Sequence, residues 1–323
     1  MTLIRFQASA MARCRFALSP LAETLACLIA LERNNNEAWI KPWVQAHRPE
    51  YVSWRDGDPV RRGILQLTAS TKWFPSMFGI VPTDGMNTRL PDELDRIRCW
   101  TDDENRADLL QSVGASWLTH DDGWLAATDL SNTAADTIRD GWHRFVGPDW
   151  HRRRTLLERD IMRRAGLLAA YGWREATMGM TPASTWAEHD ALTFSSQHYD
   201  DIVVGEDGLV FVPHTPGCGT WTCEEPPRYA LAYPACGVAA PVGATGHAAT
   251  VLLGVGRAAV LEALATPATP TQLAELLDVS LGTVSGHLKV LRDAGAIEGA
   301  RVGRTVRYTQ TSRGARFLES LSN

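Results

Sequence analysis

Thiols and an imidazole that could bind a metal or react with oxidants gather between residues 214 and 236. His214, Cys218 and Cys223 lie close together, and Cys236 follows. Thiolate and imidazole are the ligands that Zn²⁺ and softer metals prefer, commonly in tetrahedral sites. A Cys-x4-Cys spacing in a loop is not typical of structural zinc sites. We therefore expect no metal here and interpret these residues as loop or core residues, with a metal site and a redox-sensing thiol as open alternatives.

A second chemical pattern is Gly254-Val255-Gly256-Arg257-Ala258-Ala259, which matches the dinucleotide-binding fingerprint G-x-G-x-x-G/A. Too few residues follow it to supply the other strands of a nucleotide-binding sheet. We expect no cofactor, and we predict instead a helix whose packing face holds Val255, Val260, Leu261 and Leu264. Since no nucleophile–base or paired-carboxylate spacing stands out, we also predict that the protein is not an enzyme.

Basic residues concentrate near the C-terminal end of the sequence. Residues 280–316 contain seven basic and two acidic residues, although the whole chain has a formal net charge of −5. A local basic region on an acidic protein suits a sequence-specific DNA-binding protein, because phosphate contacts need only one face.

The elements that must position these basic residues follow a helix–turn–helix order. Thr269 and Pro270 are typical of an N-cap and a first helical position, and they begin a helix whose apolar stripe ends at Leu277. We expect Val279 to point inward from the turn and Ser280 to cap the next helix. In that helix the residues at helical spacing on the core side are Val284, Leu288 and Leu291.

The residues after the second helix predict a hairpin and a last helix. Gly295 should end the second helix in a left-handed conformation. Strands at 296–300 and 305–309 would flank Val302-Gly303-Arg304, and a helix over 312–321 follows. A first helix beginning near Thr250 completes a winged helix-turn-helix.

This stretch resembles the ArsR-type winged-helix regulators. The matching residues are Ala274, Val279-Ser280, Thr283-Val284-Ser285, His287-Leu288, Leu291-Arg292, Ala294-Gly295 and Gly303-Arg304. The resemblance implies a homodimeric, cytoplasmic bacterial transcription regulator whose recognition helix enters the major groove of an operator. We expect a repressor in preference to an activator. The family's usual metal-binding helices, here 270–277 and 312–321, contain no Cys or His.

The predicted DNA-binding residues lie on both helices of the helix–turn–helix and on the hairpin of residues 296–309, which is called the wing. We expect the recognition helix to read base edges, and the wing and the start of the preceding helix to contact phosphates or the minor groove. The set is Thr271, Gln272, Ser280, Gly282, Thr283, Ser285, Gly286, His287, Lys289, Arg301, Arg304 and Arg307.

The chain is too long for one winged helix, which needs about 70–100 residues, so we predict two domains. The fold class is α+β, with a mixed helix and strand domain at 1–245 and a winged helix-turn-helix domain at 246–323. In the first part we expect helices from Ser19-Pro20 to about Arg33, around 91–115 and 133–146, and from Trp150 to Tyr171. Strand-like runs occur at 191–195, 201–204, 209–213 and 229–233.

The first part also resembles the long N-terminal domain of some ArsR-type proteins. Its landmarks include Arg13-Cys14-Arg15-Phe16, Gly208-Leu209-Val210-Phe211-Val212-Pro213 and Tyr233-Pro234-Ala235. The resemblance implies a sensing or dimerisation role, and we expect a small organic effector there. An enzyme that uses the winged helix only to dimerise is the alternative. We identify no export signal and no membrane-spanning segment, so we expect reduced thiols.

Overall fold

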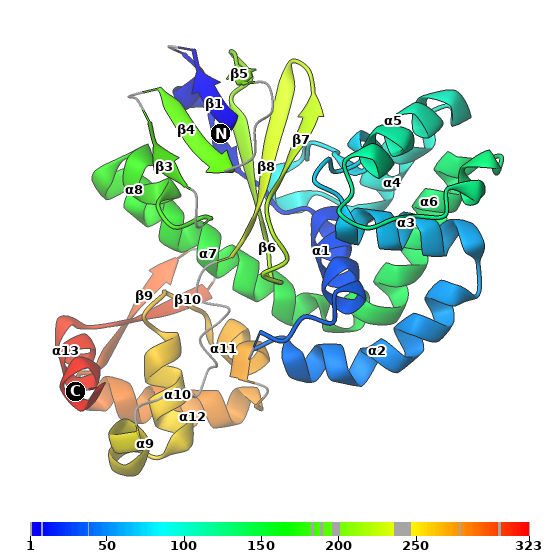
Figure 1. Cartoon of the computed structure of the whole chain (residues 1–323). Coiled ribbons are helices and arrows are strands. Elements are labelled where there is room, and N and C mark those ends of the chain that lie inside the picture. Colours follow the sequence, from blue (N-terminus) through cyan, green and yellow to red (C-terminus); the bar gives the residue numbers. More distant parts are fainter. Residues whose placement is uncertain are drawn as a thin grey trace. The chain divides into compact units, whose positions relative to one another are not determined.

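The computed structural model describes residues 2–7, 9–37, 39–181, 184–187, 190–195, 201–235, 247–277, 279–302 and 305–322. The chain divides into two compact units (Figure 1). Unit 1 comprises Met1–Asp149 and Leu167–Cys236, and unit 2 comprises Trp150–Gly166 and Gly237–Asn323. The predicted domain boundary after residue 245 lies outside the described residues and stays a prediction.

The strands of unit 1 form two sheets. One has the order β3-β4-β1-β5 and the other the order β2-β6-β8-β7. In the second sheet β6 pairs in parallel with β2 and β8, whereas β7 is antiparallel to β8. The strands are β1 Thr2–Phe6, β2 Arg15–Phe16, β3 Thr185–Trp186, β4 Ala191–Ser195, β5 Ile202–Val204, β6 Leu209–His214, β7 Trp221–Glu225 and β8 Arg228–Pro234. The four predicted strand runs are confirmed as β4, β5, β6 and β8, and the sheets also contain β1, β2, β3 and β7.

Both faces of β6 are buried, which fixes the layers of unit 1. Leu209 and Phe211 pack with the apolar side chains of the other sheet. Val210 and Val212 point the opposite way and pack against Ala26 and other residues of α1 (Pro20–Glu32). Side chains alternate between the two faces of a strand, so one strand joins a sheet–sheet interface to a sheet–helix interface. In Figure 1, α1 lies beside β6.

Helices make up the rest of unit 1. They are α2 Lys41–Asp56, α3 Pro59–Ser70, α4 Leu90–Arg98, α5 Asp102–Gly114, α6 Leu130–Gly141 and α8 Trp173–Thr177, with short helical turns η1 Ala10–Arg13, η2 Ser76–Phe78, η3 Gly85–Asn87, η4 Gly123–Ala126, η5 Trp142–Val146 and η6 Gly147–Asp149. The predicted helix 91–115 is two helices, because Thr101 caps α5 in a capping box. Helix α7 spans Trp150–Tyr171 as predicted, and its residues up to Gly166 belong to unit 2.

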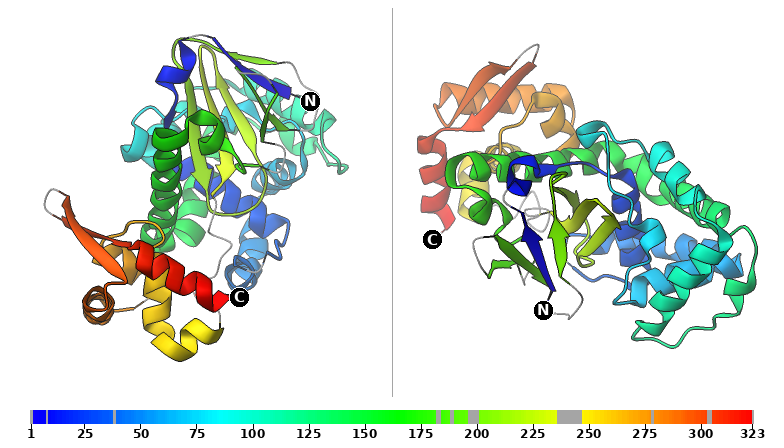
Figure 2. Two further views of the ribbon diagram at one scale, coloured as in Figure 1. Left: turned by 90° about the vertical axis from the view of Figure 1, so that its left-hand side faces the viewer. Right: turned by 90° about the horizontal axis from the view of Figure 1, so that it is seen from above.

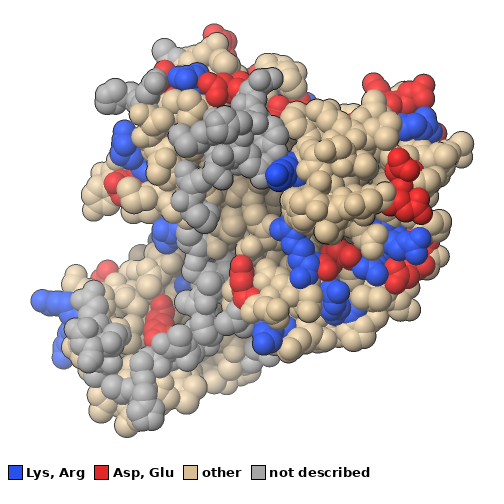
Figure 3. Space-filling view, viewed as in Figure 1, with Lys and Arg blue, Asp and Glu red and all other residues tan. Residues whose placement is uncertain are grey.

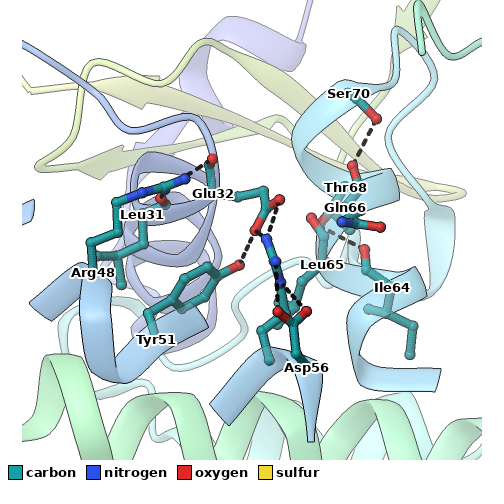
Figure 4. A network of polar contacts seen from close by, with 11 residues as sticks. Leu31, Glu32, Arg48, Tyr51, Asp56, Ile64, Leu65, Gln66, Thr68 and Ser70 are labelled. Atoms are coloured by element: carbon teal, nitrogen blue, oxygen red, sulfur yellow. Dashed lines mark hydrogen bonds and ion pairs between the residues drawn. The ribbon is translucent and has the colours of Figure 1, made fainter. Parts of the chain in front are cut away.

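Helices α2 and α3 are missing from the sequence prediction. Helix α2 contains Pro49 and buries only Val44, Tyr51 and Trp54 among its side chains, so its apolar pattern is weak. Polar contacts with the end of α1 hold it in place (Figure 4). The Tyr51 hydroxyl donates to Glu32 Oε2 at 2.9 Å, and Arg55 Nη1 lies 2.7 Å from the same carboxylate. These contacts join residues far apart in the sequence, which a local pattern cannot show.

A buried carboxylate holds the start of α1. Ser19 caps this helix, and Pro20 occupies its first position, as predicted. Glu93 of α4 accepts hydrogen bonds from Ser19 Oγ at 2.5 Å and from the Leu21 backbone N–H at 2.9 Å. Burial raises the pKa of Glu93 to about 8, although these two hydrogen bonds favour the charged form.

Unit 2 contains the predicted helix–turn–helix and hairpin. Its elements are α9 His247–Leu253, α10 Val255–Ala263, α11 Pro270–Leu277, α12 Leu281–Asp293, β9 Ile297–Val302, β10 Thr305–Gln310 and α13 Ser312–Ser322, together with the first part of α7. Val260, Leu273, Leu288 and neighbouring apolar residues form its core. The α+β class and a C-terminal helix-turn-helix are confirmed.

Two details of the predicted winged domain are wrong. The first helix is divided into α9 and α10 by Gly254, which has φ +79°. Val255 therefore begins α10 and is 67% exposed, outside the core. Val279 does not point inward: its side chain is 39% exposed, and its backbone N–H donates to the Ala274 carbonyl at 3.1 Å. Within the described part of the chain no helix could cross a membrane.

We predict that Glu93 makes stability depend on pH in an unusual direction. The folded-state pKa is raised above the unfolded value of about 4.3, so this stabilisation is complete below that value and is lost as pH rises through about 8. Relative to Glu93→Gln, the wild type should lose up to about 1.4 kcal/mol of unfolding free energy per pH unit in that window. Urea unfolding at several pH values measures this. The difference in unfolding free energy between Glu93→Gln and wild type should shift in favour of the variant from pH 5 to pH 8. A shift in favour of the wild type would contradict the prediction.

Candidate nucleic-acid interface

Reciprocal hydrogen bonds cap the first helix of the helix–turn–helix. The Gln272 backbone N–H donates to Thr269 Oγ1 at 3.3 Å, and the Thr269 N–H donates to Gln272 Oε1 at 3.0 Å. This is the capping-box arrangement. The Gln272 side-chain amide also donates to Glu158 of α7 at 3.3 Å. Its polar atoms therefore have protein partners, whereas Thr271 beside it is exposed.

Ser280 begins the second helix, as predicted. Its hydroxyl accepts from the Thr283 N–H at 3.1 Å and lies 2.8 Å from Thr283 Oγ1. Gly295 ends the helical stretch at φ +69°, in the left-handed region expected for it. Both ends of α12 are thus defined by local interactions that the sequence specifies. Asp278, in the turn, lies outside the described residues.

Helix α12 has one buried and one exposed face. Val284, Leu288 and Leu291 are buried, at no more than 3% exposure. The opposite face presents mostly small side chains to solvent, and the exposed members of the predicted set are Gly282, Thr283, Ser285, Gly286 and Lys289. The Ser285 hydroxyl donates to the Leu281 carbonyl at 2.8 Å. The hydroxyl oxygen keeps both of its lone pairs and can still accept from a donor.

His287 lies at the edge of these two faces and is half-buried. A Cβ atom on Gly256 would lie 2.5 Å from His287 Nε2, so the imidazole packs against the first turn of α10. The glycine leaves the room that this ring occupies. Base contact by His287 stays a prediction, and it would require the ring to point away from this position.

The wing carries the predicted arginines on different faces. Arg301 pairs with Val306 across the hairpin, whereas Arg307 pairs with Ala300. Cross-strand partners share a face and successive residues alternate, so Arg301 and Arg307 point to opposite sides. Arg301 is exposed and Arg307 is half-buried. Gly303 and Arg304 lie outside the described residues. Figure 2 shows the hairpin extending from the helices of unit 2.

The Cys and His residues of unit 1 lie in its interior. His214, Cys218 and Cys223 are each less than 9% exposed, and His214 stacks on Trp221 with a centroid distance of 4.9 Å. Burial raises the pKa values of both thiols to about 12 and lowers that of His214 to about 4. Among the described residues, no group of three or more His, Cys, Asp and Glu could hold a metal ion. Cys236 lies outside them.

Charged side chains are mixed over the helices of unit 1. On the face shown in Figure 3, acidic and basic groups alternate over the helical part of this unit. Ion pairs among the helices of unit 1 include Arg98 with Asp136 at 3.1 Å and Arg144 with Glu50 at 3.0 Å. This surface therefore lacks the one-signed field that a polyanion-binding face has.

Comparison with known proteins identifies the C-terminal part. The family model described as a helix-turn-helix domain matches residues 257–300. The chain therefore carries a helix-turn-helix domain. The match covers most of α10, all of α11 and α12, and the start of β9. The searches of curated proteins and of solved structures give no match. The helix-turn-helix domain supports a DNA-binding regulator in general.

We predict that Cys218 and Cys223 react slowly with a thiol reagent in the folded protein. A pKa near 12 instead of 9 lowers the thiolate fraction about a thousandfold. Exposed Cys99 should react fast, and Cys99→Ser should remove that fast phase. Ellman's reagent at pH 8 measures these rates. Fast reaction of Cys218 or Cys223 would contradict the prediction. So would one zinc per chain that is lost in Cys218→Ser/Cys223→Ser.

Proposed function

We propose that the protein is an ArsR-like transcriptional repressor that binds a double-stranded DNA operator through α12. The observation that carries this proposal is the exposed face of α12 within a matched helix-turn-helix domain. Gly282, Thr283, Ser285 and Gly286 are small, so the helix backbone can approach base edges closely. A single recognition helix fits the B-DNA major groove, which is about 12 Å wide.

The charge of the helix-turn-helix domain supports DNA over other partners. Lys289, Arg292, Arg301, Arg313 and Arg316 are exposed around α12, the wing and α13. The only acidic residues of 280–316 are Asp293 and Glu298. A module used only to dimerise within an enzyme has no need of this basic surface. Binding to DNA phosphates uses it directly, through the release of counterions.

A homodimer is part of this proposal. Val251, Leu252 and Val255 are each more than 60% exposed, and they lie together at the junction of α9 and α10. Helix α13 packs beside α9 and adds Phe317, which is 36% exposed. Exposed apolar patches on soluble proteins mark interaction surfaces. A two-fold dimer would bind half-sites about 34–36 Å apart.

Repression, a cytoplasmic location and control by an organic effector rest on the resemblance to ArsR-type regulators. Unit 1 would hold the effector, because the domain that binds DNA is small and its core is filled by its own apolar side chains. An effector changes DNA affinity only if it binds the two arrangements of the dimer with different affinity.

We predict that Lys289→Ala weakens binding to all DNA sequences alike. Loss of one phosphate contact should make the slope of log K against log[salt] shallower by about 0.9. Arg174→Ala, at an exposed position of α8 in unit 1 and outside this basic surface, is the matched control and should leave the slope unchanged. Ser285→Ala should instead relax base preference at one or two positions, at a cost of about 1–3 kcal/mol. Fluorescence anisotropy from 50 to 200 mM salt distinguishes these outcomes. An unchanged slope in Lys289→Ala, with altered base preference, would assign Lys289 to base contact.

We predict that Val251→Asp/Val255→Asp converts the protein to a folded monomer. Two buried carboxylates without partners would cost more than the apolar contact provides. Light scattering after gel filtration measures the mass, and the monomer should lose at least tenfold in operator affinity. Leu118→Asp, at an exposed apolar position of unit 1, is the control. A variant that stays dimeric would show that other residues form the interface.

A further inference from the structure

A pocket opens in unit 1 between α3 and residues 117–127. Its volume is about 420 Å³, which is within the range of small-molecule sites. Pro59, Gly63 and Gln66 line it from one face of α3, at helical spacing. His120 and Trp124 line the opposite side. All of these residues belong to unit 1.

Close packing fixes one wall of this pocket. A Cβ atom on Gly63 would lie 2.2 Å from Cε2 of Trp124, so the indole rests directly on the backbone of α3. The segment around Trp124 is anchored from α5, where Arg106 donates to the carbonyls of Leu125 at 2.9 Å and Ala127 at 3.4 Å. The indole is thus a preformed flat surface, suited to stacking with a planar ring.

Hydrogen bonds show which ring nitrogen of His120 carries the hydrogen. Its Nε2 lies 2.9 Å from Ser70 Oγ and 2.8 Å from Ser116 Oγ. Ser70 donates its hydroxyl proton to the Gln66 carbonyl, and Ser116 donates to the Ser70 carbonyl. Nε2 must therefore carry the hydrogen, which leaves Nδ1 as an acceptor. No described residue hydrogen-bonds to Nδ1. Desolvation lowers the pKa of His120, which keeps the ring neutral.

The wall of the pocket contains one basic and one acidic side chain, Arg62 and Asp121. Arg62 lies in its wall and is exposed; no described acidic group lies within ion-pair distance of it, although Arg62 is near enough to Asp56 to help lower the pKa of that carboxyl. The N-terminal turn of α3 places Pro59 and Val60 in the wall, and the Asp58 carboxylate caps this turn by accepting from the Arg61 N–H at 2.8 Å. Asp121 is also in the wall. Its Oδ1 accepts from the Gly123 N–H at 3.1 Å, which leaves the second carboxylate oxygen for another donor.

We infer that this pocket binds a small aromatic acid that carries an amino or hydroxyl group on its ring. The ring would stack on Trp124, the carboxylate would pair with Arg62, and the ring donor would bond to Asp121, in the wall that also holds the neutral His120. This inference rests on the proposed function, because it identifies the chemistry of the effector. A polyphosphate ligand fits poorly, since the lining holds a single arginine, Arg62, and also the carboxylate of Asp121.

Calorimetry with the full-length protein and no DNA tests the site. The probes are 2-aminobenzoate, benzoate, which lacks the ring donor, and aniline, which lacks the carboxylate. We expect saturable binding of 2-aminobenzoate and at least tenfold weaker binding of the other two. Arg62→Gln should weaken 2-aminobenzoate at least tenfold. Asp121→Asn should weaken 2-aminobenzoate and leave benzoate unchanged or tighter. Both positions are exposed, so the fold should tolerate these changes.

Arg174→Gln, an exposed arginine on α8, is the matched control and should bind 2-aminobenzoate as wild type does. Absence of saturable binding, tighter binding of aniline, or unchanged binding in Arg62→Gln would overturn the inference. DNA binding is measured separately by anisotropy. A protein that binds 2-aminobenzoate but no DNA would overturn the proposed function and leave the pocket assignment intact. Operator binding that 2-aminobenzoate leaves unchanged would overturn its effector role alone.

Discussion

Burial of Val284, Leu288 and Leu291 is the constraint on which the proposed function depends. These residues sit in the core of unit 2 with Val260 and Leu273, and their burial fixes the rotation of α12 about its axis. The small polar residues at the other positions must then face outward. The Ser280 cap fixes where the helix begins, so rotation and register are both set by local and core interactions. No contact with DNA is needed to form this surface.

Unit 1 depends on a different constraint, the burial of both faces of β6. Because Leu209 and Phe211 face one layer and Val210 and Val212 face another, the sheets and α1 must form together. The start of α1 is held by the buried Glu93 from α4. Helices α1 and α4 are thereby linked to the layers that pack on β6. The pocket beside Trp124 is a consequence, since α3 and the 117–127 segment are both held by these packed helices.

The sequence predicts local features well and distant contacts poorly. Thr269, Ser280 and Gly295 act within one turn of their own helix, so the helix–turn–helix could be derived from spacing alone. The orientation of His287 depends on Gly256, which is far away in the sequence and gives no local signal. The opposite faces of Arg301 and Arg307 follow from the hairpin register. Helix α2 could not be predicted, because Pro49 interrupts its helical pattern. Its contact with Glu32 of α1 joins residues that are distant in the sequence. The Trp124–Gly63 contact is likewise nonlocal.

The most direct test of the account is to sequence the genomic DNA fragments that the purified protein retains at physiological salt. We expect fragments that share an inverted repeat, with half-site centres about 10–10.5 base pairs or a multiple apart. Exposed α12 faces in a two-fold dimer would produce that symmetry. Retained fragments that share no sequence, or retention that is lost entirely at physiological salt, would contradict a sequence-specific regulator.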